Sequence, residues 1–386
     1  MILFFLLGIA IATIGWRIYY KLNWSKGVLV KLWFDKDIVY AEESTNLYEV
    51  IENRKSLPVP VLEVGFHTKK ELDFAQEENT SVSDYIYKRD IFSVLGWQKI
   101  TREIPVKCTK RGFYEIKETD IMTSSLLYKK SYRKSFENNI SIYVYPKQVN
   151  VSDIMSVCER MLGELQCSKK LYEDPFAFRT IRAYTTDDPM KTVNWKASAK
   201  TGNLMVNTFD SVLSQKAMIF LDIEDEGILK YDALVEESIA IAASLVRKLL
   251  KQGIETGFAF NGGELCFLPT NQKSKLIMLE RTLAEYDSEK SKNAIFSYTN
   301  LFDKTKYNMD FSEDTLLIFV TKNLSERLYS DIKQYIGNHY AVMVNPVTRT
   351  QAAARDYGYE SISEKISSNF SIKNKDKLRI LVKRVD

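Results

Sequence analysis

AMIFLDIEDE, from Ala217 to Glu226, is the stretch that decides the fold of the C-terminal half of the chain. It begins with a continuous apolar run, as expected for a parallel strand that is buried on both faces. An acidic loop follows at once, beginning at Asp222. Ligands of open α/β sheets bind at the carboxyl ends of the strands. The stretch therefore predicts a central strand and, directly after it, a candidate binding loop.

Strands and helices are predicted to alternate after this stretch. Residues 231–252 have the apolar stripe of an amphipathic helix, and Gly253 follows as a stop signal. Further strands are expected at 256–260, 265–268, 315–321 and 340–345, and further helices at 273–286 and 324–336. This alternation predicts a mostly parallel sheet covered by helices on both faces.

The preceding part of the chain has a different pattern. Between about residues 28 and 146, short alternating stretches such as 28–34 and 140–145 are separated by polar turn clusters. Such spacing predicts an antiparallel β-sandwich. Pro58 and Pro60 indicate an edge strand or an irregular strand at that point.

The N-terminus is apolar and uncharged from Ile2 to Trp16, and apolar residues continue after Arg17. About 20 residues are needed to span a bilayer, and Arg17 reaches the surface by snorkelling. Trp16, Tyr19 and Tyr20 are typical of an interfacial aromatic belt. The basic residues that follow favour a cytoplasmic location for the bulk of the chain. A cleaved signal peptide is the alternative, although a basic n-region and a small-residue cleavage site are missing.

Composition excludes several classes of function. The net charge is only +4 over 386 residues, which gives no support to nucleic-acid binding. The four cysteines are dispersed, so neither a disulfide framework nor a zinc ribbon is expected. The two histidines, His67 and His339, lie far apart outside any catalytic or zinc motif. No nucleophile elbow, Walker A loop or dinucleotide-binding glycine turn is present.

The most distinctive stretch is DPFAFRTIRAYTTDDPMKTVNWKASAKTGNLMVNTFD, from Asp174 to Asp210. It is rich in paired charges, and a bidentate pair between Arg182 and either Asp187 or Asp188 is a plausible structural clamp. Asp187 and Asp188 could also do acid–base work, but the flanking cations favour ion pairing. Trp195 is predicted to pack inside, with a partner for its indole N–H.

The segment RAYTTDDPMKTVNWKASAK, from Arg182 to Lys200, resembles the signature of the family called domain of unknown function 58. Ala183 and Thr186 stand where the family usually has glutamate and glycine. The signature residues that we assign to an interaction role are Arg182, Tyr184, Asp187, Asp188, Lys191, Asn194, Trp195, Lys196 and Ser198.

The resemblance implies the organisation of nearly the whole chain. It predicts an α+β multidomain protein with a transmembrane anchor (1–22), a β-sandwich (25–150), the signature region (151–214) and a von Willebrand A-like α/β domain (215–386). Many relatives begin with two membrane helices, whereas this chain offers one. The implied location is the bacterial cytoplasmic membrane, crossed once. The implied partners are a MoxR-type AAA+ ATPase and, in some cases, a transglutaminase-like membrane protein.

The cation site of von Willebrand A domains is degenerate in this sequence. Their first strand ends in D-x-S-x-S, and the corresponding positions here are Asp222, Glu224 and Glu226. Lys322 follows a later strand, where a second aspartate would be expected, and a lysine there repels a cation. We therefore predict no cofactor, while weak Mg²⁺ or Ca²⁺ binding remains chemically possible. A solvated acidic loop is the simpler interpretation.

These observations predict a non-enzymatic scaffold or adaptor. A cation-dependent, adhesion-type A domain is the first alternative, and a hydrolase is the second. Membrane lipid is a further expected partner, because the basic stretch at 373–384 is suited to an anionic surface. A closing surface strand or helix is the simpler interpretation of that stretch.

Overall fold

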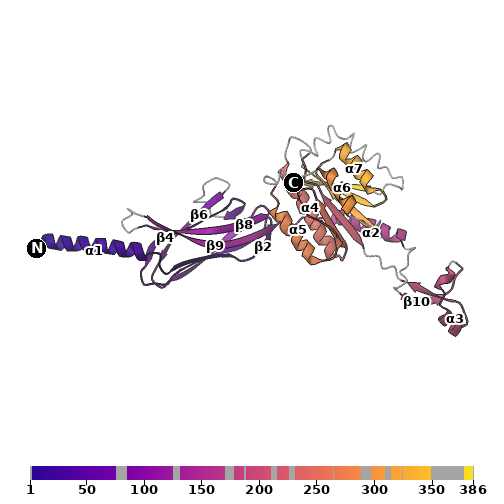
Figure 1. Ribbon diagram of the computed structural model, residues 1–386, viewed down its shortest axis with the longest axis horizontal. Coiled ribbons are helices and arrows are strands. Elements are labelled where there is room, and N and C mark those ends of the chain that lie inside the picture. The colour runs from indigo at the N-terminus through magenta and orange to yellow at the C-terminus, as the bar shows by residue number, and fades with distance from the viewer. Residues whose placement is uncertain are drawn as a thin grey trace. The chain divides into compact units, whose positions relative to one another are not determined.

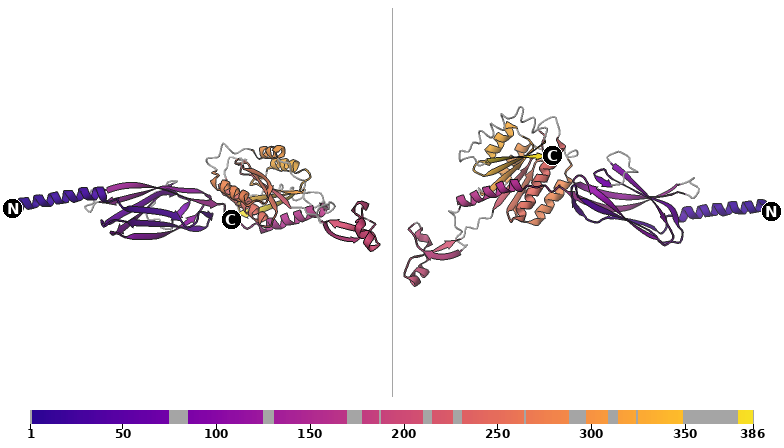
Figure 2. Two further views of the ribbon diagram at one scale, coloured as in Figure 1. Left: turned by 60° about the horizontal axis from the view of Figure 1, so that its bottom comes forward. Right: turned by 180° about the vertical axis from the view of Figure 1, so that it is seen from behind.

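The computed structural model describes residues 2–74, 85–124, 131–169, 178–186, 188–209, 215–225, 231–263, 265–287, 297–308, 314–323, 325–348 and 378–385. The chain divides into two compact units (Figure 1, Figure 2). The first contains residues 1–148 and 280–287, and the second contains residues 149–279 and 288–386. The β-rich part of the first unit is called the β unit below, and the sheet-containing part of the second is called the α/β unit.

Helix α1 (Ile2–Asn23) confirms the predicted apolar N-terminal helix. Its side chains are exposed over most of its length, as hydrocarbon-facing residues would be. The segment Phe4–Asn23 is long and apolar enough to cross a membrane, a test that a signal sequence near the N-terminus also passes.

The C-terminal end of α1 is built into the β unit. Tyr20 and Trp24 are buried in an apolar cluster with residues of several strands, including Val30 and Ile121. Lys55 Nζ donates to the carbonyl oxygen of Asn23 at 2.6 Å and also to that of Trp24. A cation at this position satisfies carbonyl groups that a helix end leaves open.

Two sheets form the β unit. One has the order β1 (Val28–Phe34), β3 (Ser44–Asn53), β7 (Lys99–Cys108), β5 (Leu72–Phe74). The other has the order β2 (Ile38–Tyr40), β9 (Ser131–Tyr145), β8 (Gly112–Ser124), β4 (Val59–Lys69), β6 (Tyr85–Val94). Inward residues of both sheets, such as Val106 and Val144, share one core. Alternation of buried and exposed residues along the strands places the apolar set on that face.

The sheets of the β unit are antiparallel, as predicted, except for one pair. Strand β2 runs parallel to β9. The predicted irregularity at Pro60 is present as a register shift between Val59 and Leu62, where β4 pairs with β6. Proline lacks the N–H that a regular ladder requires.

The α/β unit contains a six-stranded sheet, which confirms the predicted mostly parallel sheet. Its strands are β12 (Lys216–Leu221), β13 (Glu255–Phe260), β14 (Cys266–Thr270), β15 (Thr315–Val320), β16 (Ala341–Thr348) and β17 (Leu378–Val385). Their order is β14-β13-β12-β15-β16-β17, and only β14 is antiparallel to its neighbour. The order reverses between β12 and β15, a switch point at which such sheets bind ligands.

Helices lie on both faces of this sheet (Figure 1). They are α2 (Ser152–Lys169), α4 (Asp232–Lys251), α5 (Lys273–Glu285), α6 (Tyr298–Asn308) and α7 (Glu326–Ile336). Helices α6 and α7 cover the face that carries Met218 and Phe220. Strand β17 accounts for part of the basic stretch at 373–384 and pairs with β16, whereas residues 373–377 lie outside the described residues.

Glu49 is an exception in the core of the β unit. Its side chain lies on β3 with only 1% of the residue exposed. Neither carboxyl oxygen has a hydrogen-bond partner among the described residues. Burial, followed by the charge of Asp90, raises the pKa of Glu49 from its ordinary value of 4.5 to about 7, against the opposite influence of Arg102 and Lys88.

We expect Glu49→Gln to stabilise the protein at pH 8 and to have little effect at pH 4. The folded state holds the Glu49 proton more tightly than the unfolded state, so stability falls as the pH rises from the unfolded pKa towards about 7. The amide removes this loss, which is on the order of 3 kcal/mol. Thermal unfolding across this pH range measures it. Glu118→Gln, at an exposed position on β8, is the control, and an equal response of both variants would contradict the prediction.

Candidate functional site

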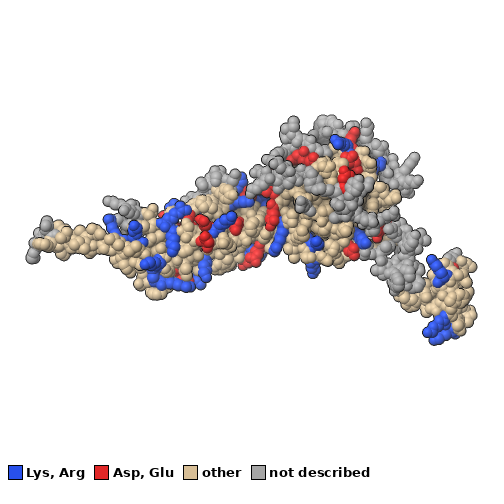
Figure 3. Space-filling view, viewed as in Figure 1, with Lys and Arg blue, Asp and Glu red and all other residues tan. Residues whose placement is uncertain are grey.

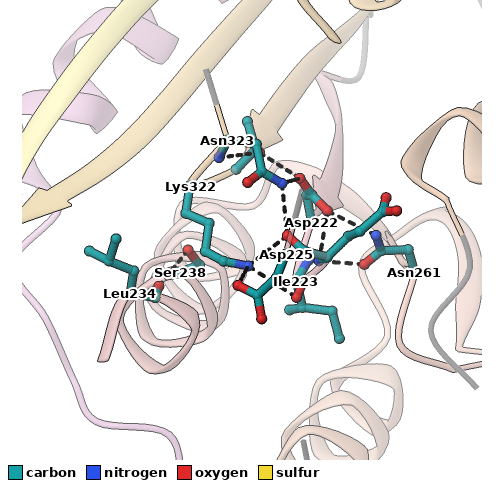
Figure 4. A network of polar contacts seen from close by, with 10 residues as sticks. Asp222, Ile223, Asp225, Leu234, Ser238, Asn261, Lys322 and Asn323 are labelled. Atoms are coloured by element: carbon teal, nitrogen blue, oxygen red, sulfur yellow. Dashed lines mark hydrogen bonds and ion pairs between the residues drawn. The ribbon is translucent and has the colours of Figure 1, made fainter. Parts of the chain in front are cut away.

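Asp222 is the centre of a polar network at the carboxyl end of β12 (Figure 4). The residue is fully buried. Its carboxylate accepts hydrogen bonds from Thr321 Oγ1 at 2.6 Å, Asn261 Nδ2 at 2.8 Å, Asn323 Nδ2 at 2.9 Å and the Glu224 backbone N–H at 3.0 Å. Burial raises the pKa of the Asp222 carboxyl, while the hydrogen bond from Thr321 is the largest opposing influence. The three side-chain donors come from the ends of β13 and β15, on either side of β12, and the Glu224 N–H belongs to the loop after β12.

Lys322 supplies a positive charge beside this network. Its side chain is 2% exposed, and Nζ forms an ion pair with Asp225 Oδ1 at 2.8 Å. The same ammonium group donates to the carbonyl oxygens of Glu224 at 2.6 Å and Ile223 at 3.2 Å. Figure 4 shows Lys322 reaching across the strand ends to the loop after β12. Three oxygen atoms of the loop after β12 therefore surround the buried ammonium group of Lys322.

Two of the three predicted metal residues, Asp222 and Glu224, are described, and both accept hydrogen bonds from groups of the chain itself. Asp222 is saturated by donors, and the Glu224 carboxylate accepts from the backbone N–H of Tyr298, at the start of α6, at 3.0 Å. Glu226 lies outside the described residues. Among the described residues, no group of three or more His, Cys, Asp and Glu side chains is placed to hold a metal ion.

Sequence reasoning missed Asn261, Asn323 and Tyr298. The two asparagines follow β13 and β15 directly, and residues after neighbouring parallel strands meet at one edge of the sheet. Their position directly after these strands could have identified the two asparagines as candidate site residues. Tyr298 carried no comparable signal, because it opens a helix that the sequence pattern did not predict.

The signature residues form a small separate motif, called the signature module below. It consists of β10 (Phe178–Ala183), a 3₁₀ turn η1 (Met190–Thr192), α3 (Trp195–Thr201) and β11 (Met205–Phe209). Strands β10 and β11 pair as an antiparallel ribbon. Val193 and Val206, which form a bridge, are its buried apolar centre.

Arg182 and Asp188 clamp the turn of the signature module. Arg182 donates from Nη1 and Nη2 to the two carboxyl oxygens of Asp188 at 2.7 and 2.6 Å. Thr185 adds donors from its backbone N–H and its hydroxyl. The Arg182 guanidinium is the main reason why the pKa of Asp188 is lowered to about 2. This pairing is one of the two that the sequence suggests, and Asp187 lies outside the described residues.

Asn194 and Ser198 join α3 to β11. Asn194 Oδ1 accepts from the Ala197 backbone N–H at 2.9 Å, which makes Asn194 the N-cap of α3. Asn194 Nδ2 donates to Asn207 Oδ1 at 2.8 Å. Ser198 Oγ donates to the Asn194 carbonyl oxygen and accepts from the Met205 N–H. Both side chains therefore hold the module together rather than face a ligand.

The prediction that Trp195 packs inside is wrong. The residue is 65% exposed, at the first position of a helix that contains no buried residue. A module of this size has too little interior for an indole ring. Lys191 and Lys196 are also exposed, and Tyr184 is half-buried. The outward face of the module therefore combines an aromatic ring with positive charge.

Comparison with known proteins gives a distant relative in sequence and solved structures with low TM-scores. No family model matches the chain. The uncharacterized protein YeaD of Bacillus subtilis is 23% identical over 181 residues, which are 46% of this chain and 44% of that protein. The chain thus spans less than half of the length of this relative.

The solved structures that resemble the chain do so weakly. The CARDB domain of PF1109 from Pyrococcus furiosus has 11% identity and a TM-score of 0.19, covering 30% of this chain and 94% of that domain. Domains D2 and D3 of the major pilin SpaD from Corynebacterium diphtheriae have 10% identity and a TM-score of 0.22, over 30% and 52%. The GH20 exo-β-N-acetylglucosaminidase of Vibrio harveyi has 8% identity and a TM-score of 0.24, over 83% and 82%. At these scores the likenesses support neither a shared fold nor a shared activity.

We expect Asp188→Asn to loosen the turn of the signature module. The amide lacks the charge that Arg182 pairs with, so the Thr185 N–H should exchange with solvent several times faster, as judged by NMR or mass spectrometry. In the wild type, the contribution of the pair is present above the ordinary carboxyl pKa of about 4. It is lost as the pH falls towards about 2. Lys200→Gln, an exposed change on α3, should leave the exchange rate of Thr185 unaltered.

We expect Lys322→Ala to lower the free energy of unfolding by roughly 3 kcal/mol, because Asp225 and two carbonyl oxygens lose a buried partner. The vacated position is lined by oxygen atoms, so millimolar Mg²⁺ should restore part of the lost thermal stability. Wild type and Lys333→Ala, an exposed change on α7, should show no such response. Equal Mg²⁺ stabilisation of wild type would contradict this assignment.

Proposed function

We propose that the chain is a membrane-anchored, non-enzymatic bacterial scaffold or adaptor that acts with a MoxR-type AAA+ ATPase. In this proposal α1 crosses the cytoplasmic membrane once, and the rest of the chain lies in the cytoplasm. A transglutaminase-like membrane protein is a second proposed partner. The observation that carries the proposal is the signature module, whose polar side chains are used to hold its own turns while Trp195 is exposed.

The signature residues support binding rather than catalysis. Asp188 is held ionised by Arg182, so it is a poor general acid or base near neutral pH. The hydroxyl of Ser198 is bonded to backbone groups of its own module. Tryptophan is among the residue types that contribute most of the binding energy at protein interfaces, and Trp195 is exposed. An adaptor needs a rigid surface with an exposed aromatic side chain, and the signature module has both.

We also propose that the α/β unit is von Willebrand A-like and that the chain belongs with the domain of unknown function 58. The sheet order, with a single antiparallel strand next to β13, and the position of Asp222 after the central strand support the first assignment. The Arg182–Lys200 segment supports the second.

Cation-dependent adhesion is the second candidate function, favoured by the position of Asp222 at the switch point of the sheet. The Lys322 ammonium counts against it, because it lies among the oxygen atoms that a divalent ion would need. A hydrolase is supported by no arrangement of nucleophile and base among the side chains described above.

An affinity pull-down from detergent-solubilised native membranes tests the adaptor proposal. Wild type should recover an AAA+ ATPase, and Trp195→Ala/Lys196→Glu should lose it, because both side chains are exposed and contribute little to folding. Trp33→Ala, an exposed tryptophan change in the β unit, is the matched control and should retain it. Failure of the wild type to recover any ATPase would contradict the proposed partnership.

A further inference from the structure

Two turns of the β unit lie at the C-terminal end of α1. The first is bonded to the helix, and the second is bonded to the first. Lys55, in the turn between β3 and β4, donates to the last carbonyl groups of α1, at Asn23 and Trp24. The N–H of Arg54, in the same turn, donates to the carbonyl oxygen of Gly27 at 2.7 Å. The turn at residues 54–57 therefore lies at the level where α1 leaves any bilayer that it crosses.

A second turn, residues 95–98 between β6 and β7, is fastened to the first. The Trp97 N–H donates to the Lys55 carbonyl oxygen at 3.0 Å. Asn53 Nδ2 donates to the carbonyl oxygens of Leu57 and Leu95, both at 2.9 Å. A Cβ atom at Gly96 would lie 2.5 Å from the carbonyl oxygen of Ser56, so only glycine permits this close approach. The two turns are thus one rigid surface.

Trp97 is an unusual residue for this surface. Its φ angle of 58° lies in the left-handed region, where glycine or asparagine is far less costly than a bulky residue. Its ring is nevertheless 74% exposed, and the neighbouring Leu95 side chain is exposed as well. Both residues therefore leave most of their surface exposed in this arrangement. Two large apolar groups on a strained, fastened turn indicate contact with something outside the β unit.

Positive charge surrounds the same end of the β unit. Exposed basic residues here are Arg17, Lys21, Lys26, Arg54 and Lys99. Arg54 is paired with Glu52. Figure 3 shows Lys and Arg side chains gathered over the end of the β unit next to α1, with few Asp or Glu side chains on that part of the face. Anionic phospholipid headgroups complement such a surface.

The length of α1 sets the level of this surface. The apolar segment Phe4–Asn23 has 20 residues. At 1.5 Å per residue it spans about 30 Å, the thickness of the hydrocarbon core. The interfacial residues Trp16, Tyr19 and Tyr20 mark the level at which α1 leaves the hydrocarbon, so Asn23 and the turns bonded to it lie within the headgroup layer. Tryptophan is enriched in this layer because one side of its ring system is apolar while its N–H is polar.

We propose that the turn at residues 95–98 is a second membrane contact, in which Leu95 and Trp97 enter the interfacial layer of an anionic phospholipid bilayer. Lys26 and Lys99 contact the headgroups beside them. This inference rests on the membrane anchoring by α1 that is part of the proposed function. It fixes which end of the β unit faces the lipid.

Depth-dependent quenching of tryptophan fluorescence tests the contact in the full-length protein. The protein is reconstituted into vesicles of phosphatidylcholine and phosphatidylglycerol in equal parts, with or without acyl chains brominated near the headgroup. The Trp97 signal is the difference between wild type and Trp97→Phe. Trp16→Phe gives the corresponding signal of the anchor. Trp33→Phe is the matched control, because Trp33 is an exposed tryptophan that lies roughly 16 Å further along β1 than Val28.

We expect the Trp97 signal to lose roughly half of its intensity in brominated vesicles, since interfacial depth places its ring near the bromine atoms. The Trp33 signal should be unchanged. A quenched Trp16 signal with an unquenched Trp97 signal would overturn the second contact and leave the anchor intact. If neither is quenched, the anchoring proposal fails together with the inference. If neither brominated lipid nor aqueous acrylamide quenches Trp97, the residue is covered by a protein partner and not by lipid. That result would overturn the proposal.

Discussion

The buried carboxylate of Asp222 constrains the loops at the carboxyl edge of the α/β unit. A charged or polar group without partners in a protein interior costs several kcal/mol, so donors must be brought to it. They come from the ends of strands that flank β12, and each of these loops is thereby fixed relative to the central strand. Lys322 then adds the positive charge that this buried acidic region needs, and its own three oxygen partners include Asp225. The Asp222 carboxylate and the Lys322 ammonium group are thus both partnered by groups of the chain.

The signature module follows the same principle at a smaller scale. Arg182 and Asp188 hold the turn, and Asn194 and Ser198 hold α3 against β11, so these four side chains are engaged within the module. What the module presents outward is Trp195 with lysines around it. A motif whose polar side chains form hydrogen bonds within the motif has a rigid surface. A rigid surface is suited to recognition, because it loses little conformational entropy on binding.

Much of the architecture was predictable because periodicity is a local property. The apolar run at Ala217–Leu221 and the helical stripe that follows it are sufficient for a parallel sheet with covering helices. The orientation of Trp195 was not predictable, since burial depends on how much interior a segment shares with the rest of the chain. The role of Lys322 was only half predictable. Its charge indicated repulsion of a metal, but its reach to Glu224 and Asp225 joins residues almost 100 positions apart, and no local pattern records such a contact.

The junction between α1 and the β unit has a mechanical consequence. Tyr20 and Trp24 are packed in the same cluster as strand residues, and Lys55 fastens the last turn of the helix. A helix that ended in a flexible linker would rotate and tilt independently of the domain after it. Here the helix and the strands move together, so if α1 crosses a bilayer as proposed, a change in its tilt is transmitted to the strands. Conversely, a pull or twist applied to the β unit is felt directly by the helix.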